Sequence, residues 1–336
     1  MKITIDQYKR LMSILDRPFL YPGCVRKSRL QRFIDNFKWW AINGRVNEDD
    51  NLYGIDLVGV DWSTFLTHRQ RIIDMDDARK KFKYDQLLNI LDNKYLFALF
   101  CQNNNLPHPT ILEFYSNGKR EILVEGFLEK HLGKQNIFCK QTTGCGGYNV
   151  KCIKNKEQLD LIRTEWSDKE YILQEGVTND SILSSLNNKS LNTIRCVTLS
   201  DGEKISVFAA VLRCGTSDSG DVDNVSSGGI VIGIDDSGKL MKWGNYDNPL
   251  KEKRTVHPDS NIEFLGFEIP HFKDAINTAI RAHQCIKDVP SIGWDVAITE
   301  SGTILIEGNY DWGLQIMQMC HGGLKKQWDE FVKVWK

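Results

Sequence analysis

Two acidic side chains and an amide stand close together near the carboxyl end of the sequence. Asp295 lies in the apolar run 293–299, and Glu307 and Asn309 follow in the run 304–309 after a glycine-containing turn. The two runs predict a β-hairpin, in which Glu307 and Asn309 face the same side because they are two positions apart. If Asp295 pairs across the hairpin, three oxygen ligands of the kind that Mg²⁺ prefers converge. A surface hairpin is the alternative, but acids among aliphatic residues need a partner, which favours the metal.

A lysine followed by a glycine-rich turn forms the second candidate. Lys140 ends an apolar run, and Gly144, Gly146 and Gly147 follow before the next apolar run begins. Glycine lets backbone N–H groups approach a phosphate closely, and the lysine supplies a compact positive charge. The turn is not a Walker A loop, because no Gly-Lys-Ser/Thr follows and a strand is expected in place of a helix. An ordinary hairpin turn is equally compatible with these residues.

A strand with a polar exit forms the third candidate. The apolar residues 171–173 lead into Gln174, Glu175 and Val177, and Asp180 follows shortly after. Backbone N–H and C=O groups at such an exit can pair with the edge of an adenine, and Asp180 is near enough in sequence to reach a ribose. Taken alone, a strand end with a solvated glutamate explains the same residues.

Two arginines follow on neighbouring strands. Arg195 lies within the apolar run 193–199, and Arg213 ends the next one. Arginine binds phosphate or carboxylate groups through two parallel hydrogen bonds, so either side chain is a candidate ligand for such a group. A salt bridge between strands is the alternative. His257 lies further along and either orients a substrate or holds a loop.

These side chains depend on elements far apart in the sequence. We expect an α+β chain with a mainly helical N-terminal region over residues 1–85, a small lobe with its lead-in helix over 86–176, and a large lobe over 177–336. Glu175 is the expected hinge between the lobes. The expected strands are 122–124, 137–140, 149–153, 171–174, 193–199, 205–212, 229–234, 293–299 and 304–307, and the clearest amphipathic helix is 272–286.

Composition excludes several classes of protein. The 336 residues include 43 basic and 44 acidic side chains, so nothing in the charge recruits nucleic acid or an acidic membrane surface. The nine cysteines are an odd number without C-x-x-C spacing, which argues against a disulfide framework and a zinc knuckle. No apolar run approaches the ~20 residues of a membrane span, and the start lacks the apolar core of a signal peptide. We expect a cytoplasmic protein.

Several phrases in this order carry a resemblance to a known family. They are FCKQTTGCGG, YILQEGV, LNTIRCVTL, NVSSGGI, VHPDS and IGWDVAITESGTILIEGN, and they extend over roughly residues 90 to 320. The chain resembles the ATP-grasp superfamily and, more narrowly, the sugar-transfer-associated ATP-grasp family related to α-L-glutamate ligases. The resemblance implies two α+β lobes with a nucleotide between them. The helical N-terminal region departs from the α/β domain that usually precedes this fold.

The resemblance also implies roles for the candidate residues. Lys140, Lys94 and the glycine loop at 144, 146 and 147 resemble the groups that hold the nucleotide phosphates, although the family's aspartate before the earlier lysine is Asn93 here. The remaining positions resemble an adenine-reading hinge (Gln174, Glu175, Val177), a ribose contact (Asp180), magnesium ligands (Asp295, Glu307, Asn309) and arginines that steady the γ-phosphate or an acyl-phosphate (Arg195, Arg213).

The implied activity is ATP- and Mg²⁺-dependent ligation of a carboxylate to an amine through an acyl-phosphate. The family association suggests that an amino acid is coupled to a sugar acid in surface-polysaccharide biosynthesis. The expected partners are a small-molecule or saccharide carboxylate and an amine, with no nucleic acid and no membrane span, and the oligomeric state stays open. A small-molecule kinase and a non-catalytic nucleotide-binding module are the alternatives.

Overall fold

A computed structural model describes residues 4–144, 149–219 and 227–335. The predictions made for Gly146 and Gly147 lie outside the described residues. None of the helices in these ranges is both long and apolar enough to cross a membrane.

The N-terminal region is helical, as the sequence predicts. It contains α1 (Ile5–Leu15), α2 (Arg29–Asn43), α3 (Asp50–Tyr53), the 3₁₀ turn η1 (Trp62–Thr64) and α4 (His68–Phe82). The starts of α1 and α2 are set by capping boxes, in which the hydroxyl of Thr4 or Ser28 accepts a hydrogen bond from the backbone three residues on. Gly44 ends α2 with φ 69°, a left-handed conformation that glycine adopts without strain.

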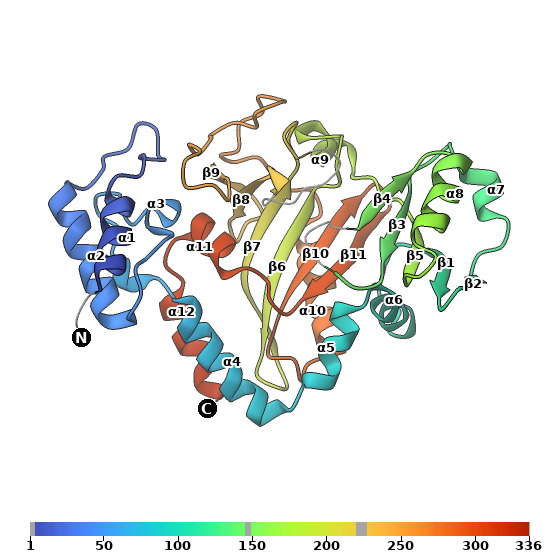
Figure 1. Ribbon diagram of the computed structural model, residues 1–336, viewed down its shortest axis with the longest axis horizontal. Coiled ribbons are helices and arrows are strands. Elements are labelled where there is room, and N and C mark those ends of the chain that lie inside the picture. The colour runs from blue at the N-terminus through green and yellow to red at the C-terminus, as the bar shows by residue number, and fades with distance from the viewer. Residues whose placement is uncertain (1–3, 145–148, 220–226, 336) are drawn as a thin grey trace.

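The first sheet has five antiparallel strands in the order β2-β1-β5-β3-β4. Its elements are β1 (Ile111–Ser116), β2 (Lys119–Ile122), α7 (Phe127–His131), β3 (Ile137–Gln141), β4 (Val150–Ile153), α8 (Lys156–Glu165) and β5 (Tyr171–Glu175). Apolar side chains from α8 pack on the sheet together with Leu112, Ile137 and Leu173. This small lobe lies at one end of the molecule (Figure 1).

The second sheet has six antiparallel strands in the order β11-β10-β6-β7-β8-β9. Its strands are β6 (Thr193–Ser200), β7 (Ile205–Cys214), β8 (Ile230–Ile234), β9 (Leu240–Asn245), β10 (Ser291–Thr299) and β11 (Gly302–Asn309). The helices around it are α5 (Asp85–Asp92), α6 (Lys94–Asn103), α9 (Ser181–Leu186), α10 (Phe272–Gln284), α11 (Leu314–His321) and α12 (Lys325–Phe331), followed by η3 (Val332–Val334).

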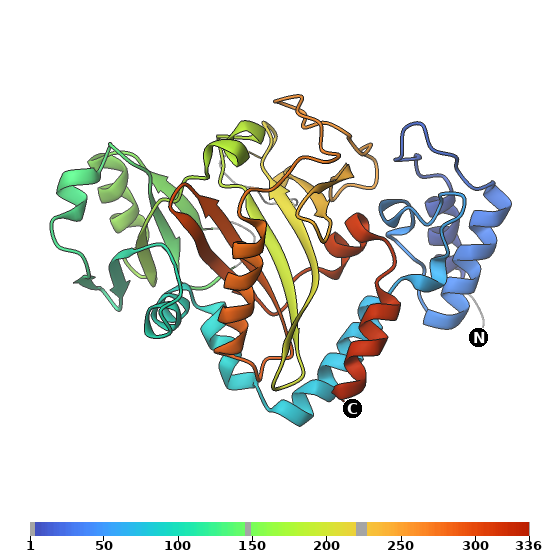
Figure 2. The same cartoon turned by 180° about the vertical axis from the view of Figure 1, so that it is seen from behind.

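Two layers of helices cover the large sheet. Buried side chains of α5, α6 and α10 pack with one face, and those of α11, α12 and the N-terminal region pack with the other. Figure 2 shows α10 lying across the first of these faces, and both views place α4 beside α12. Trp328 of α12 donates a hydrogen bond from its ring nitrogen to Asp74 of α4 (2.9 Å), which joins the C-terminal helix to the N-terminal region.

The expected strand at 122–124 is wrong. The strand there is β2, which ends at Ile122, and the backbone N–H groups of Leu123 and Val124 instead both donate to the carbonyl of Leu112. All four residues of β2 are exposed, so this edge strand carries no apolar signature. The other expected strands and the helix after Phe272 are confirmed to within three residues, whereas β1 and β9 were not predicted.

Buried asparagines fix the entry of the chain into the large lobe. The side chain of Asn179 donates to the carbonyls of Asn192 (2.9 Å) and Ile298 (3.2 Å), and its oxygen accepts from the backbone N–H of Asn192. Asn192 in turn donates to the carbonyls of Leu183 and Asn187. These bonds satisfy backbone groups that no strand partner reaches, so the segment after β5 is held in one conformation.

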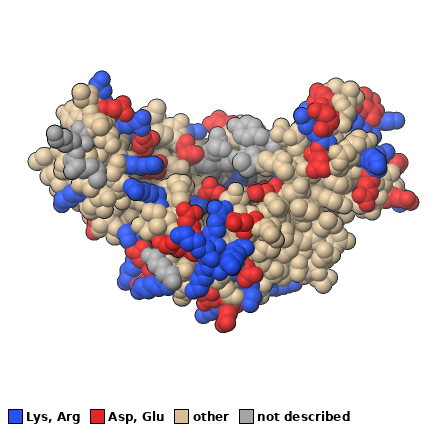
Figure 3. Space-filling view, turned by 60° about the horizontal axis from the view of Figure 1, so that its bottom comes forward, with Lys and Arg blue, Asp and Glu red and all other residues tan. Residues whose placement is uncertain are grey.

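The last turn of α4 is basic, with Arg79, Lys80 and Lys81 in consecutive positions. Arg79 pairs with Asp85 at 2.6 Å, and Lys81 donates to the carbonyl of Val334. Figure 3 turns the lower side of Figure 1 toward the viewer and shows basic and acidic side chains intermingled there. Intermingled charges are typical of a solvated helix face.

His283 of α10 gives the fold a testable sensitivity to acid. It is fully buried, its Nε2 donates to the carbonyl of Val289 (2.7 Å), and its Nδ1 accepts from the hydroxyl of Thr198 (2.6 Å). Burial lowers the pKa of His283 to about 4, so the unfolded chain binds the proton more tightly than the folded chain. The contribution of His283 to the free energy of unfolding is therefore fully present above the unfolded pKa of roughly 6.5. It decreases as the pH is lowered, by about 2 kcal/mol at pH 5.

Urea unfolding at pH 7.5 and pH 5 measures this loss. The variant His283→Gln should show a smaller difference between the two pH values than the unmodified protein. His271→Gln, at an exposed histidine before the same helix, is the control and should leave the difference unchanged. An equal pH difference in all three proteins would contradict the assignment to His283.

Candidate active site

An acid–arginine cluster lies on one face of the large sheet. The predicted hairpin is confirmed, with Asp295 on β10 paired in register with Glu307 on β11 and with Arg195 on β6. Arg213 lies two positions along β7 from the partner of Arg195, so its side chain projects from the same face. We call Arg195, Arg213, Asp295, Glu307 and Asn309 the acid–arginine cluster.

Asp295 is the centre of this cluster and is only 2% exposed. Its Oδ1 accepts from Nε of Arg195, and its Oδ2 accepts from Nη2 of Arg195 (2.8 Å) and Nη1 of Arg213 (2.5 Å). Burial alone would raise the pKa of Asp295, but the two guanidinium charges outweigh it and hold the pKa well below its usual range. The salt bridge considered for each arginine is therefore present, and both arginines make it to one carboxylate.

Glu307 and Asn309 lie at the open side of the cluster. The Nδ2 of Asn309 donates to Oε1 of Glu307 (3.1 Å), and Arg195 approaches the same oxygen at 3.8 Å. Desolvation and the neighbouring charge of Asp295 raise the pKa of Glu307, although 38% of its side chain stays exposed. The two side chains thus offer accessible oxygen atoms beside a fixed positive charge.

Lys140 brings the small lobe to this cluster. Its Nζ donates to Oε1 of Gln174 (2.7 Å) on the adjoining strand β5, two positions from Ile172, the residue opposite Lys140. Burial lowers the pKa of Lys140 to about 8, the charge of Glu307 partly offsets this, and the charge of Lys94 adds to it. The pKa of Lys140 thus depends on charges that two other elements carry, Lys94 at the start of α6 and Glu307 on β11.

Lys94 lies at the start of α6 and contacts the glycine turn. Its Nζ donates to the carbonyl of Gly144 (2.8 Å), and its backbone N–H donates to the carbonyl of Thr142 (2.7 Å). Asn93 caps the helix by accepting from the backbone N–H groups of the two residues after Lys94. The asparagine before this lysine therefore has a structural explanation.

The residues expected to form a hinge lie where β5 leaves the small sheet. Gly176 donates from its backbone N–H to the carbonyl of Asn136 (2.8 Å), and a Cβ at this position would lie only 2.5 Å from that oxygen. Glu175 accepts from the amide of Gln135, and Val177 follows half-buried. Asp180 caps α9 by accepting from the backbone N–H of Leu183 (2.9 Å). The strand exit is thus tightly bound to the neighbouring strand.

His257 holds a loop, which is one of its two predicted roles. Its Nε2 donates to the carbonyl of Gly215 (2.9 Å), and its Nδ1 accepts from the backbone N–H groups of Asp259 and Ser260. The ring is fully buried, and burial lowers its pKa. Because Nδ1 accepts two bonds, the neutral ring is the form that fits.

The donor set of the cluster fits a magnesium ion. Glu307 and Asn309 supply hard oxygen atoms, and Asp295 retains one lone pair beyond the three guanidinium bonds that it accepts. In the described ranges, no group of three or more His, Cys, Asp or Glu side chains could hold a metal ion. A magnesium ion here would therefore depend on two carboxylates, one amide and donors from a nucleotide or water.

The sequence did not predict the residues that contact the cluster from the loop after β11. The carbonyl of Trp312 accepts from Nη1 of Arg195 (3.2 Å). Gly293 makes room for this contact, because a Cβ there would lie 2.4 Å from Cβ of Trp312. A glycine inside a strand is a known sign of such a close approach and was the available signal. Arg71, which contacts the same loop, carried no signal.

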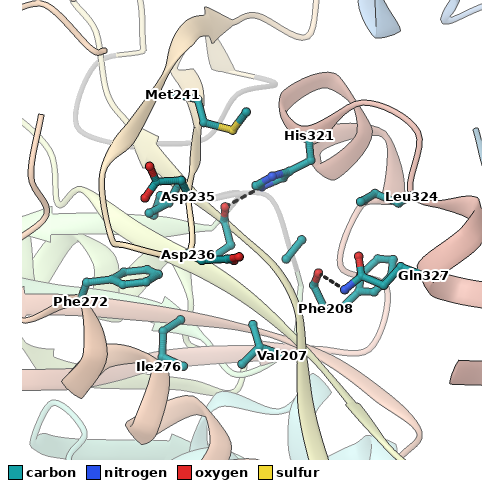
Figure 4. Close-up of a pocket in the computed structure, with 13 residues that line it drawn as sticks. Val207, Phe208, Asp235, Asp236, Met241, Phe272, Ile276, His321, Leu324 and Gln327 are labelled. Carbon is teal, nitrogen blue, oxygen red and sulfur yellow. Dashed lines mark hydrogen bonds between the residues drawn. The ribbon is translucent and has the colours of Figure 1, made fainter. Parts of the chain in front are cut away.

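A separate pocket of about 550 Å³ lies at the edge of the large sheet (Figure 4). Strand β8 pairs only with the second half of β7, so the first half is an open edge. His321 and Gln327 reach this edge and donate to the carbonyls of Ala210 (2.8 Å) and Phe208 (2.9 Å). The residues that line the pocket include none of the acid–arginine cluster.

Two antiparallel sheets, one bearing Lys140 and the other the acid–arginine cluster, together with a family match over residues 76–332, make the chain an ATP-grasp protein of the α+β class. More narrowly, residues 76–332 match the family described as sugar-transfer associated ATP-grasp, and the chain belongs to that family. A comparison with curated proteins found no match.

Several solved structures resemble the chain at low identity. A D-Ala:D-Ser ligase (VanG) from Enterococcus faecalis has TM-score 0.45 and 12% identity over 74% of this chain and 62% of its own. A D-alanine–D-alanine ligase from Bacillus anthracis has TM-score 0.43 and 11% identity over 73% and 68%. An ADP complex of N5-carboxyaminoimidazole ribonucleotide synthetase has TM-score 0.40 and 15% identity over 67% of this chain. This chain spans 46% of that synthetase, and the family assignment rests on residues 76–332.

Proposed function

We propose that the chain is an ATP- and Mg²⁺-dependent ligase that activates a carboxylate and joins it to an amine. One observation carries this proposal: α6, whose first residue Lys94 contacts the glycine turn that follows Lys140, packs against β11, which bears Glu307 and Asn309. A nucleotide phosphate placed between these elements would meet lysines on one side and oxygen ligands for its metal ion on the other. The arrangement supplies charge and position, which are the main requirements of phosphoryl transfer.

Each candidate residue has a role in this proposal. The phosphates are assigned to Lys140, Lys94 and Gly144 with Gly146 and Gly147, the adenine to Gln174, Glu175 and Val177, and the ribose to Asp180. Glu307, Asn309 and Asp295 would hold the magnesium ion. Bound there, the ion would neutralise charge on the phosphates.

The chemistry needs no protein nucleophile. A carboxylate oxygen of the substrate attacks the γ-phosphorus, the bond to the β-phosphate oxygen breaks, and ADP leaves. The amine then attacks the acyl carbon, phosphate leaves, and the nitrogen loses a proton to form the amide. Arg195 and Arg213 would steady the negative charge of the transferring group, held in place by Asp295.

We infer the substrates from the family description. A sugar acid and an amino acid are the proposed carboxylate and amine, and surface-polysaccharide biosynthesis in the cytoplasm is the proposed setting. The division into residues 1–85, 86–176 and 177–336 belongs to the same proposal. The small lobe would carry the lysines and the large lobe the metal ligands.

Trapping the activated intermediate tests the proposal. With Mg-ATP, a panel of sugar acids and hydroxylamine in place of the amine, a ligase should release ADP and form a hydroxamate that depends on the carboxylate. Reactions without the carboxylate give the background ATPase rate. Phosphorylated product without hydroxamate would identify a kinase, and Mg-ATP binding without ADP release from any pair would identify a binding module. Either result contradicts the ligase assignment.

A further inference from the structure

Arg71 of α4 is a buried arginine that lies before the first residue matched by the family. Only 5% of the residue is exposed, yet both terminal nitrogens donate to Oδ1 of Asp311, at 3.0 and 2.7 Å. Its guanidinium group also lies 4.8 Å from the ring centroid of Trp312. Arg71 therefore holds two consecutive residues of the loop that leaves β11, directly after Asn309.

That loop supports the acid–arginine cluster. Trp312 is fully buried, and its ring nitrogen donates to Oγ of Ser291 at 3.1 Å. Its carbonyl accepts from Nη1 of Arg195, and a Cβ built on Gly293 would lie within 3.0 Å of both Trp312 and Arg195. The chain of contacts from Arg71 to Asp295 thus has only Trp312 and Arg195 between its ends.

Stability alone gives a poor account of Arg71. Its side chain is 7% exposed and that of Asp311 is 65% exposed, so a buried charge reaches out to a solvated carboxylate. A buried charge is costly, and well-packed apolar residues often replace buried ion pairs without loss of stability. Unlike an apolar residue, the guanidinium group forms hydrogen bonds of fixed geometry to the loop beside the cluster.

We propose that Arg71 is a positioning residue for the nucleotide site: by fixing Asp311 and Trp312, it sets the position of the Arg195 guanidinium beside Asp295 and Glu307. The N-terminal helical region is then part of the catalytic unit. This inference rests on the proposed nucleotide site.

Mg-ATP affinity of the full chain, measured by calorimetry at several Mg²⁺ concentrations, tests the inference. Supporting residues of this kind typically change affinity or activity by about 10- to 100-fold, so Arg71→Gln should weaken Mg-ATP binding about tenfold. Arg71→Lys keeps the charge without the fork and should recover only part of the loss. Arg79→Gln, on the same helix at an exposed ion pair, is the matched control and should stay within about twofold.

A double-mutant cycle with Arg195→Lys separates positioning from general stability. If Arg71 acts through Arg195, adding Arg71→Gln to Arg195→Lys should cost little further affinity. Equal losses in both backgrounds, or Arg71→Gln binding as tightly as the unmodified protein, would overturn the inference. If Arg71→Gln does not fold, Arg71→Lys and Asp311→Asn enter the same cycle. No Mg-ATP binding by the unmodified protein would instead sink the proposed nucleotide site, and the inference with it.

Discussion

Replacing Glu307 by glutamine is expected to lower ATP turnover on the order of a hundredfold while the fold persists. The change keeps the size of the side chain and its hydrogen bond from Asn309, but removes a negative charge from the proposed metal site. Magnesium ions bind a charged carboxylate far better than a neutral amide, so the Mg²⁺ concentration for half-maximal turnover should rise as well. ADP release across a Mg²⁺ titration measures both effects.

Glu300→Gln is the matched control, because it lies in the turn of the same hairpin. Its Oε1 accepts from the backbone N–H of Ser181 (2.9 Å), a bond that glutamine can also accept. The control should turn over ATP at the normal rate. Unchanged turnover and Mg²⁺ dependence in Glu307→Gln would remove Glu307 from the site.

Replacing Asp295 by asparagine is expected to cost about 3–5 kcal/mol of folding stability as well as activity. Asp295 accepts hydrogen bonds from both Arg195 and Arg213, and all three side chains are at most 11% exposed. Asparagine can accept only through its one oxygen, so two buried guanidinium groups lose the negative charge of the carboxylate that they share. The urea midpoint should fall sharply and the melting temperature with it.

Asp85→Asn supplies the comparison, since its pair with Arg79 is exposed on both sides. Exposed pairs contribute roughly 0–1 kcal/mol, so this variant should unfold almost like the unmodified protein. A loss of stability in Asp295→Asn no larger than in Asp85→Asn would mean that the two arginines find other partners.

The parts of the site that follow from local pattern were predictable from sequence. Residues two apart on a strand share a face, and a glycine turn between two apolar runs makes a hairpin, so the convergence of Asp295, Glu307 and Asn309 followed from residues 293–309 alone. Lys140 could be placed in the same way, at the end of a strand before a glycine-rich turn. Each of these inferences depends on neighbours within about 15 residues.

The partners of the arginines were beyond this reach. Arg195 lies 100 positions from Asp295, and Arg71 lies 240 positions from Asp311, so no spacing rule links them. Sequence left salt bridge and ligand binding open for Arg195, and the structure shows the salt bridge. It falls on Asp295, the residue expected to bind metal. Strand β2 was not predicted correctly for another reason, because an exposed edge strand has no apolar face that a sequence pattern could reveal.

The capped edge of β7 bears on how separate copies of the chain meet. An open strand edge is a template on which another molecule can add a strand, the first step of many aggregates. Here the carbonyls of Phe208 and Ala210 are already bound by Gln327 and His321. The glutamine side chain does not titrate, and a protonated histidine still carries a proton on Nε2. Both hydrogen bonds can therefore persist when the pH is lowered. Two side chains therefore occupy the carbonyl groups that a strand from another molecule would need. No additional strand of this chain has to cover the edge there.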